Sequence, residues 1–162
     1  MNKNSAQIIK LAQEVLNIES EEILKVSKNI SNNFSDAVNE ILKCSGRIVV
    51  SGMGKSGHIA RKIASTFAST GTPAFFMHPG EASHGDLGMI TQEDIVIFFS
   101  NSGQSNELIS IFPTIKRIGA KIIGISGNVN SELANQADIH ISAAVTKEAC
   151  PLGLAPTASS SV

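Results

Sequence analysis

The sequence predicts an α/β domain, a three-layer sandwich in which a five-stranded parallel sheet lies between helices. Five short apolar segments alternate with segments of helical character, at residues 47–53, 74–77, 94–100, 121–126 and 140–145. Several of them, such as RIVVSGM and DIVIFFS, are apolar on both faces, which is typical of strands buried on both sides. Strands that alternate with helices in this way form parallel sheets covered by helices on each face.

Residues 1–45 precede the first strand and are predicted to be helices of the same domain. Apolar residues recur at helical spacing in two runs, the first over residues 8–16 and the second over residues 23–42. Ser45-Gly46 is a plausible end of the second run. Residues 46–162 are then expected to form the α/β core.

Three further helices are expected between the strands. A glycine-rich turn opens a helix that runs through Ile59, Ile63 and Phe67, and a short helix covers residues 131–136. Residues 108–118 are also predicted to be helical, and Pro113 within them indicates either a kink or a late helix start.

Composition narrows the class of protein. With 42% hydrophobic and 17% charged residues in 162, the chain is long and apolar enough for one ordered domain. A net charge of −1 with no basic block argues against nucleic acid or an anionic membrane as partner. No stretch resembles a signal peptide or spans a bilayer. Cys44 and Cys150 form no disulfide framework, so a cytoplasmic location is expected.

Polar residues concentrate in the segments that follow the predicted strands. In a sheet built with right-handed crossovers these segments meet along one edge, where open α/β sheets bind their ligands. The segments are residues 52–57, 78–88, 100–105, 126–131 and 146–156.

The segment GMGKSG after the first strand matches a dinucleotide-binding pattern. A dinucleotide site also needs an acid at the end of the second strand, and Glu81 comes too late for that; Val49 stands where a Walker A glycine would be needed. Lys55 lies at a helix start, where the helix dipole disfavours a cation unless an anion is bound. Gly54, Lys55 and Ser56 are therefore candidates for anion binding, and a solvated lysine is the alternative.

The segment SNSGQS after the third strand is suited to a phosphate group. Ser100, Ser102 and Ser105 offer hydroxyl donors, Gly103 permits close backbone approach, and the following helix offers free N–H groups. An ordinary serine-rich N-cap turn is the alternative.

Acidic and histidine side chains lie in the neighbouring segments. Glu107 lies one helical turn beyond SNSGQS, and Glu148 follows the last strand; each alone could equally be a helix-dipole partner or a solvated charge. The segment HPGEASHGD, which contains His84, matches no strong metal-binding spacing, so it is expected to line the site without a metal.

Three segments together resemble the sugar-isomerase (SIS) domain of arabinose 5-phosphate isomerases. They are VVSGMGKSGHIARKIASTFASTGTPAFFMHPGEASHGDLGM, SNSGQSNE and KEACPLGLAPT, and the similarity covers nearly all of the chain from about Arg47 onward. The resemblance implies the SIS fold and the interconversion of D-arabinose 5-phosphate and D-ribulose 5-phosphate, without a cofactor, for synthesis of the Kdo sugar of lipopolysaccharide. It also implies a homotetramer with sites at subunit interfaces.

Carried over by position, Lys55, Glu107 and Glu148 match residues held to be functional in that family. The residues expected to bind substrate are Gly54, Ser56, His84, Ser100, Asn101, Ser102, Gly103, Ser105 and Thr157. The family's later SHPGG-type segment, which carries a functional histidine, and its pair of CBS domains have no counterpart here. The sequence is therefore expected to be a C-terminally truncated isomerase domain.

Aldose–ketose isomerisation moves a proton between C1 and C2 through an enediol, which requires a base and an acid. We expect Glu148 to be the base, Glu107 its acid or orienting partner, and Lys55 the group that neutralises phosphate or a developing oxyanion. Two alternatives are a non-catalytic SIS module that senses a phosphosugar and a nucleotide-binding Rossmann domain.

Overall fold

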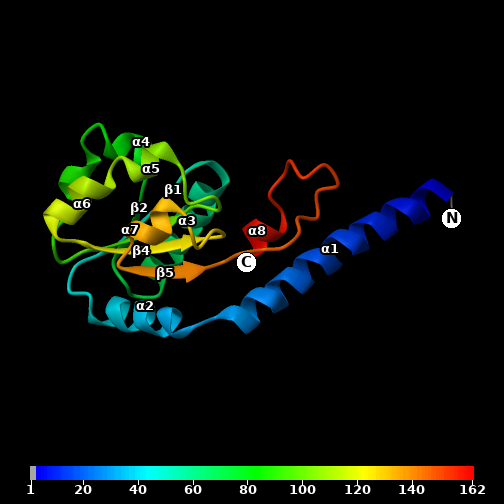
Figure 1. Ribbon diagram of the computed structural model, residues 1–162, viewed down its shortest axis with the longest axis horizontal. Helices are drawn as coiled ribbons and strands as arrows, with labels where there is room; N and C mark the ends of the chain where they lie inside the picture. The colour runs from blue at the N-terminus through cyan, green and yellow to red at the C-terminus, as the bar shows by residue number, and fades with distance from the viewer. Residues whose placement is uncertain (1–2) are drawn as a thin grey trace.

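The computed structural model describes residues 3–162, which fold into an α/β domain with a long helix projecting from it (Figure 1). The elements are α1 (Lys3–Asn29), α2 (Asn32–Lys43), β1 (Ile48–Gly52), α3 (Gly54–Ser69), β2 (Ala74–Met77), α4 (Pro79–Ala82), the 3₁₀ helix η1 (Asp86–Met89), β3 (Ile95–Phe99), α5 (Asn106–Ile109), α6 (Phe112–Ile118), β4 (Lys121–Ser126), α7 (Glu132–Gln136), β5 (Ile139–Ser142) and α8 (Ala158–Ser161).

As predicted, the five strands form one parallel sheet, and their order in it is β2-β1-β3-β4-β5. Val50 of β1 pairs with Phe76 of β2 on one side and with Ile97 of β3 on the other. The strand order therefore reverses beside β1. In such sheets the crevice at the carboxyl ends of the strands flanking the reversal is where ligands bind.

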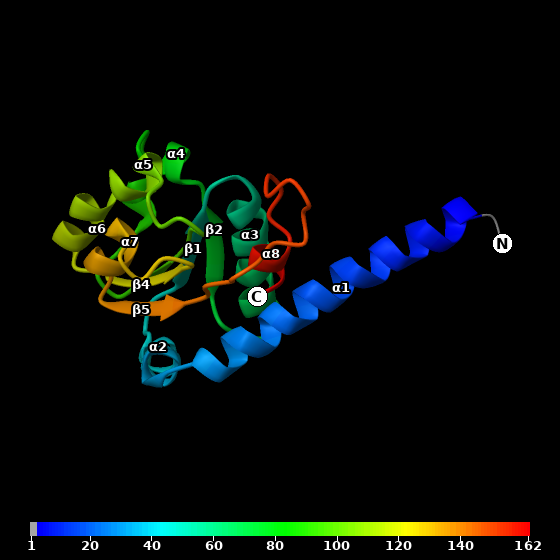
Figure 2. The ribbon, with the colours of Figure 1, turned by 45° about the vertical axis from the view of Figure 1, so that its right-hand side comes forward.

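Strand side chains alternate between two buried cores, one on each face of the sheet. Val49, Val96 and Phe98 point to the face covered by α4 to α7, whereas Ile48 and Val50 point to the face covered by α2 and α3 (Figure 2). The three-layer prediction is confirmed. Because both faces are covered, the functional groups are left at the edge of the sheet.

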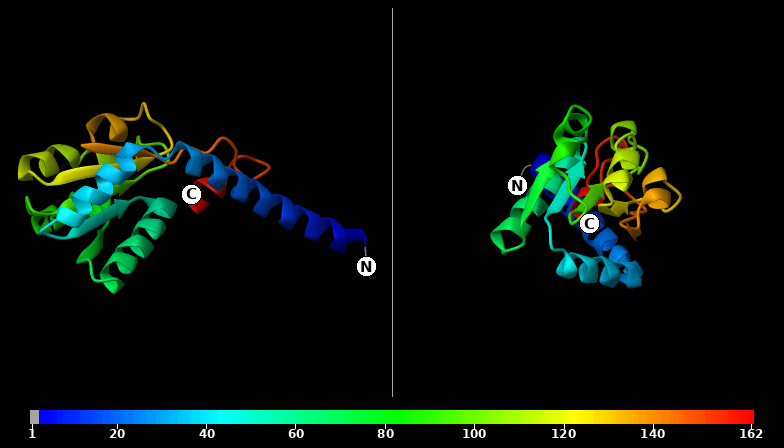
Figure 3. Two further views of the ribbon diagram at one scale, coloured as in Figure 1. Left: turned by 90° about the horizontal axis from the view of Figure 1, so that it is seen from below. Right: turned by 90° about the vertical axis from the view of Figure 1, so that its left-hand side faces the viewer.

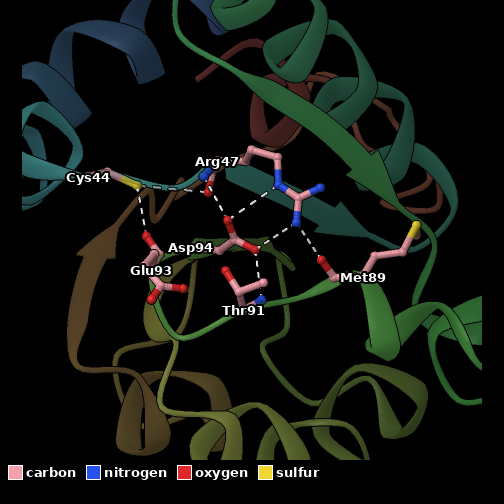
Figure 4. A network of polar contacts seen from close by, with 6 residues as sticks. All are labelled: Cys44, Arg47, Met89, Thr91, Glu93 and Asp94. Atoms are coloured by element: carbon pink, nitrogen blue, oxygen red, sulfur yellow. Dashed lines mark hydrogen bonds and ion pairs between the residues drawn. The ribbon is translucent and has the colours of Figure 1, made fainter.

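Asp94 joins the amino ends of β1 and β3, opposite the loops of interest (Figure 4). Its side chain is buried and accepts hydrogen bonds from Arg47 N (2.7 Å) and Thr91 N (2.8 Å), and the Arg47 guanidinium pairs with it at 3.1 Å. Burial raises its pKa, but the bonds from Thr91 and Arg47 outweigh burial, so the pKa lies below its ordinary value. Nearby, the Cys44 thiol donates to Glu93 O at 3.3 Å.

The clearest differences from the sequence prediction lie in residues 108–118, residues 23–42 and strand β5. Residues 108–118 form two helices, α5 and α6, and Pro113 lies in the first turn of α6, which is the late start that a proline permits. The apolar run over residues 23–42 is divided, because α1 continues to Asn29 and α2 begins at Asn32. Strand β5 ends at Ser142, since the chain leaves the sheet after Ala143 N donates to Ser126 O.

Helix α1 extends well beyond the sheet, and only its C-terminal part lies beside the rest of the domain (Figures 1 and 3). Seven of its large apolar side chains are 36–66% exposed; they are Ile8, Ile9, Leu11, Val15, Leu16, Ile23 and Leu24. Short helix α8 packs between α1 and α3 (Figure 2). Of the helices in residues 3–162, none has the length and apolar character needed to cross a bilayer.

Candidate functional site

The loops after β1, β3, β4 and β5 meet at the carboxyl edge of the sheet. Parallel pairing in register places the ends of these strands side by side, so Gly52 of β1 faces Phe99 of β3, and Ser126 of β4 faces Ser142 of β5. Functional residues that are distant in sequence are thus neighbours in the fold, as the topology predicts.

The β1 loop leads directly into α3. Gly54 has a φ of +51°, a conformation that favours glycine, and Lys55 and Ser56 lie in the first turn of the helix. A Cβ on Gly57 would come 2.6 Å from the Gly52 carbonyl oxygen, so this glycine lets α3 pack closely on β1. Lys55 is exposed at the amino end of a 16-residue helix, an arrangement that favours an anionic ligand.

The serine loop, residues 100–105, is shaped by its own hydroxyl groups. Ser100 is 6% exposed, and its Oγ accepts a hydrogen bond from Gly103 N at 3.1 Å and lies 3.3 Å from Ser105 Oγ. Gly103 has a φ of +64°, and a Cβ there would collide with the Ser131 side chain. Asn101 and Ser102 are exposed. Ser100 thus fixes the turn that presents Asn101 and Ser102 to solvent.

Glu148 lies in the long loop after β5 and is held by the segment that begins α8. Its Oε2 accepts hydrogen bonds from Thr157 N (2.7 Å), Thr157 Oγ1 (2.8 Å) and Ser159 N (3.3 Å). Thr157 Oγ1 in turn accepts a hydrogen bond from Ala149 N at 2.7 Å. The carboxylate is therefore oriented by groups 9 to 11 residues farther along the chain.

The electrostatic environment keeps Glu148 ionised. Partial burial raises its pKa, but hydrogen bonds from Ser159 and Thr157 outweigh burial, and the pKa lies below its ordinary value. A carboxylate that is ionised at neutral pH can accept a proton from a substrate held against it.

Two cavities open at this edge and share Asn101 and Gly127. The smaller, about 300 Å³, is lined by Asn101, Gly127, Asn128, Val145, Thr146, Lys147 and Glu148. The larger, about 480 Å³, is lined by Ser56, Ser100, Asn101 and Ser126, by apolar side chains of α3, and by α8. The structure therefore brings the serine loop together with Glu148 on one side and with Ser56 on the other.

Other predicted residues line neither cavity. Lys55 is exposed at the start of α3, Glu107 is exposed in the first turn of α5, and His84 is exposed after α4. Thr157, predicted to bind substrate, has its hydroxyl bonded to Ala149 N and Glu148. The smaller cavity is also lined by Gly127, Asn128 and Lys147, which the sequence analysis did not select as site residues. Each of them lies in a loop that was predicted to reach this edge. The pair Gly127-Asn128, close behind β4, was the sequence feature that could have indicated the cavity.

Two of the four histidines take part in local hydrogen bonds. His78 Nδ1 accepts a hydrogen bond from Gly80 N at 3.1 Å, and His140 Nε2 lies 2.9 Å from Ser126 Oγ. Burial lowers the pKa of His140. Within residues 3–162, no three His, Cys, Asp or Glu side chains are clustered closely enough to hold a metal ion.

The family model of the SIS domain matches residues 41–162, which is most of the chain. The chain belongs to the SIS domain family. The SIS domain is 54% identical over 147 residues to the arabinose 5-phosphate isomerase KdsD of Escherichia coli K12, a match that covers 91% of this chain and 45% of that protein. It is 56% identical, with the same coverage, to KdsD of Yersinia pestis. The chain thus spans about half the length of these curated relatives.

Solved structures confirm the fold. The SIS domain superposes on the c3406 protein of E. coli CFT073, solved in complex with arabinose 5-phosphate, with a TM-score of 0.94 and 41% identity, over 100% of this chain and 85% of that one. A putative sugar-phosphate isomerase of Listeria monocytogenes gives a TM-score of 0.93 at 34% identity, over 99% and 84% of the two chains. The expected resemblance to arabinose 5-phosphate isomerases is confirmed.

Proposed function

We propose that this SIS domain interconverts D-arabinose 5-phosphate and D-ribulose 5-phosphate. The observation that carries the proposal is the cavity lined jointly by Asn101 of the serine loop and by Glu148, whose carboxylate is oriented and ionised. A phosphate-binding loop beside a fixed base is what an isomerase of small sugar phosphates requires. The identity to KdsD proteins supports the same reaction.

Substrate binding is assigned to the two loops that flank the strand-order reversal. The exposed Lys55, the free N–H groups at the start of α3, and Asn101 and Ser102 are suited to a phosphate group. The proposed phosphate site also includes Gly54, Ser56 and Ser105. The shape of the serine loop is set by Ser100 and Gly103. Holding the phosphate at the end remote from C1 positions the reacting carbons.

Proton transfer is assigned to Glu148. It removes the proton from C2 of the aldose, and the electron pair moves to form the enediol as the C1 oxygen takes up a proton. A proton is then delivered to C1 while the C2 hydroxyl gives up its proton, which leaves the C2 carbonyl of the ketose. Glu107 is assigned as the acid that accompanies Glu148 or as its orienting partner, and Lys55 as the group that neutralises phosphate or developing negative charge. No electrons leave the substrate, so the step needs no redox cofactor.

We further propose that the SIS domain acts as a homotetramer in the cytoplasm, in the synthesis of Kdo. The exposed apolar side chains of α1 support an oligomer, because an apolar surface of this extent is typical of interfaces. The exposure of Lys55, His84 and Glu107 supports a site completed by a second subunit. Two free cysteines, Cys44 and Cys150, are suited to a reducing compartment.

The test is a calorimetric titration of the 162-residue chain with arabinose 5-phosphate and with NAD, combined with an assay for ribulose 5-phosphate. Sugar-phosphate binding with turnover supports the proposal. Binding without turnover would favour a phosphosugar-sensing module, and NAD binding alone would favour a nucleotide-binding domain. Glu148→Gln should bind sugar phosphate but lose turnover, whereas Glu21→Gln, on the exposed face of α1, should retain both.

A further inference from the structure

Glu22 is a buried carboxylate on a helix that is otherwise largely exposed. It is 1% exposed, whereas its neighbour Glu21 is exposed. Glu22 Oε2 accepts a hydrogen bond from Thr146 N at 2.6 Å, and Oε1 accepts one from Thr146 Oγ1 at 2.7 Å. Lys25 Nζ lies 2.6 Å from Oε1 and also donates to Thr146 Oγ1 at 2.8 Å. Burying a carboxylate is costly unless such partners surround it, so the contact specifies where Thr146 must lie.

Thr146 is two residues from Glu148, in a stretch with few other attachments. After Ala143 N bonds to β4, residues 144–147 form no helix or strand. Among the residues that the structure describes, every hydrogen bond that ties residues 144–147 to another part of the chain is made with Glu22 or Lys25 of α1. The path of this stretch is therefore set by α1.

A second contact links α1 to the other end of the same segment. Glu19 Oε2 accepts a hydrogen bond from Ser161 Oγ of α8 at 2.8 Å. Glu19 and Glu22 are three residues apart and therefore lie on one face of the helix. Glu148 and Thr157, which bond to each other, lie between the two attachment points. Helix α1 thus holds both ends of the segment that carries Glu148, and Glu148 lies next to the end held by Glu22.

We propose that Glu22 is a positioning residue that locks the loop after β5 onto α1 and so fixes Glu148 at its cavity. The task of Glu148 rests on the proposed function; the lock itself rests on the Glu22–Thr146 contacts. The lock also makes the position of α1 a determinant of the site, although α1 contributes no residue to the cavity.

The test compares Glu22→Gln with Glu21→Gln in the 162-residue chain. Glutamine keeps the shape of Glu22 but removes its charge and one acceptor. We expect kcat for arabinose 5-phosphate to fall roughly 10-fold to 100-fold in Glu22→Gln, as for a misplaced catalytic group. KM should change little, because the phosphate is held by other loops. Hydrogen exchange should become faster over residues 143–149 but not in β1 or β3.

A second pair of variants covers the case in which Glu22→Gln does not fold. Thr146→Val removes the hydroxyl but keeps the backbone N–H, so it should show a smaller loss of kcat, and Thr146→Ser should restore it. Wild-type kcat in Glu22→Gln, or equal losses of kcat in Thr146→Val and Thr146→Ser, would contradict the proposal that Glu22 positions the loop after β5.

Failure of the proposed function gives a different result. If the wild-type chain forms no ribulose 5-phosphate, the isomerase assignment fails. Hydrogen exchange alone then tests whether Glu22 holds the loop after β5 on α1. Faster exchange over residues 143–149 in Glu22→Gln, but not in Glu21→Gln, then supports it, and equal exchange in the two variants overturns it.

Discussion

At the scale of single residues, the hydroxyl group of Thr157 orients Glu148, the candidate base. Thr157 Oγ1 accepts from Ala149 N and donates to Glu148 Oε2, and Thr157 N donates to the same oxygen. Hydrogen bonds to a carboxylate favour its charged form and restrict its rotation. Thr157, expected from the sequence to bind substrate, has in this structure a role in orienting Glu148.

Thr157→Val should weaken that arrangement. Valine matches threonine in shape but leaves Ala149 N without its acceptor and removes one bond to Glu148, so unfolding free energy should fall by about 1–3 kcal/mol. The pKa of Glu148 should rise, which moves the acid limb of the pH profile of kcat to higher pH. Thr157→Ser is the control and should behave as wild type. An unchanged acid limb in Thr157→Val would contradict this role.

Because of Glu22, the free energy of unfolding should depend on pH in the acid range. The side chain of Lys25, followed by the backbone and hydroxyl of Thr146, lowers the pKa of Glu22 from its ordinary value of 4.5 to about 2. Because the folded-state pKa is depressed, the stabilisation is complete above pH 4.5 and is lost as pH falls toward 2. Urea titrations should show wild type more stable than Glu22→Gln at pH 7, with the gap closing between these limits. A gap that stays constant would contradict the lowered pKa.

At the scale of elements, the sequence predicted the sheet better than the helices. Strands β2 and β4 have the predicted limits, because each is an apolar run between turn-forming residues. The break between α1 and α2 was missed, since apolar spacing continues through Ile30 and only Ser31, the N-cap of α2, marks it. The sequence could not distinguish a kink at Pro113 from a late helix start, because both leave the same sequence pattern. The structure shows the late start.

The close packing of α3 on β1 gives an element-scale prediction. Gly57→Ala would place a Cβ 2.6 Å from the Gly52 carbonyl oxygen, which is backbone and cannot rotate away. Helix and strand must then separate, at a cost of about 1–3 kcal/mol in unfolding free energy. Gly88→Ala, with nothing within 4 Å of the added Cβ, is the control for a glycine replaced in open space. Equal stability of the two variants in urea would contradict the packing argument.

At the scale of the whole molecule, α1 presents a series of exposed apolar side chains. Leu16 is 66% exposed and Leu11 is 55% exposed. Helix α1, which carries them, extends away from the sheet (Figure 3). The sequence showed this helix to be amphipathic, but its direction away from the domain follows only from the three-dimensional path of the chain. The contact between Glu22 and Thr146, which are 124 residues apart, could not be predicted from the sequence either, because neither residue type is unusual at its position.

The proposed oligomer can be tested on this helix. Leu11→Glu with Leu16→Glu should place charges within the interface and reduce the mass found by sedimentation equilibrium toward the 17.0 kDa of one chain. Wild type and the control Val129→Glu, which is 57% exposed after β4, should sediment as the homotetramer. A wild-type mass of one chain, or no change in the double variant, would contradict an interface through α1.

In the proposed reaction, Glu148 moves a proton between C1 and C2 of a pentose phosphate bound at the carboxyl edge of the sheet. Its most direct test follows arabinose 5-phosphate in D₂O by proton NMR. With wild type, the C2 proton signal of arabinose 5-phosphate should disappear as ribulose 5-phosphate forms, and Glu148→Gln should slow this loss by roughly 10²–10⁴-fold. Loss of the C2 proton at the wild-type rate in Glu148→Gln, or no loss of it with the wild-type chain, would contradict this role of Glu148.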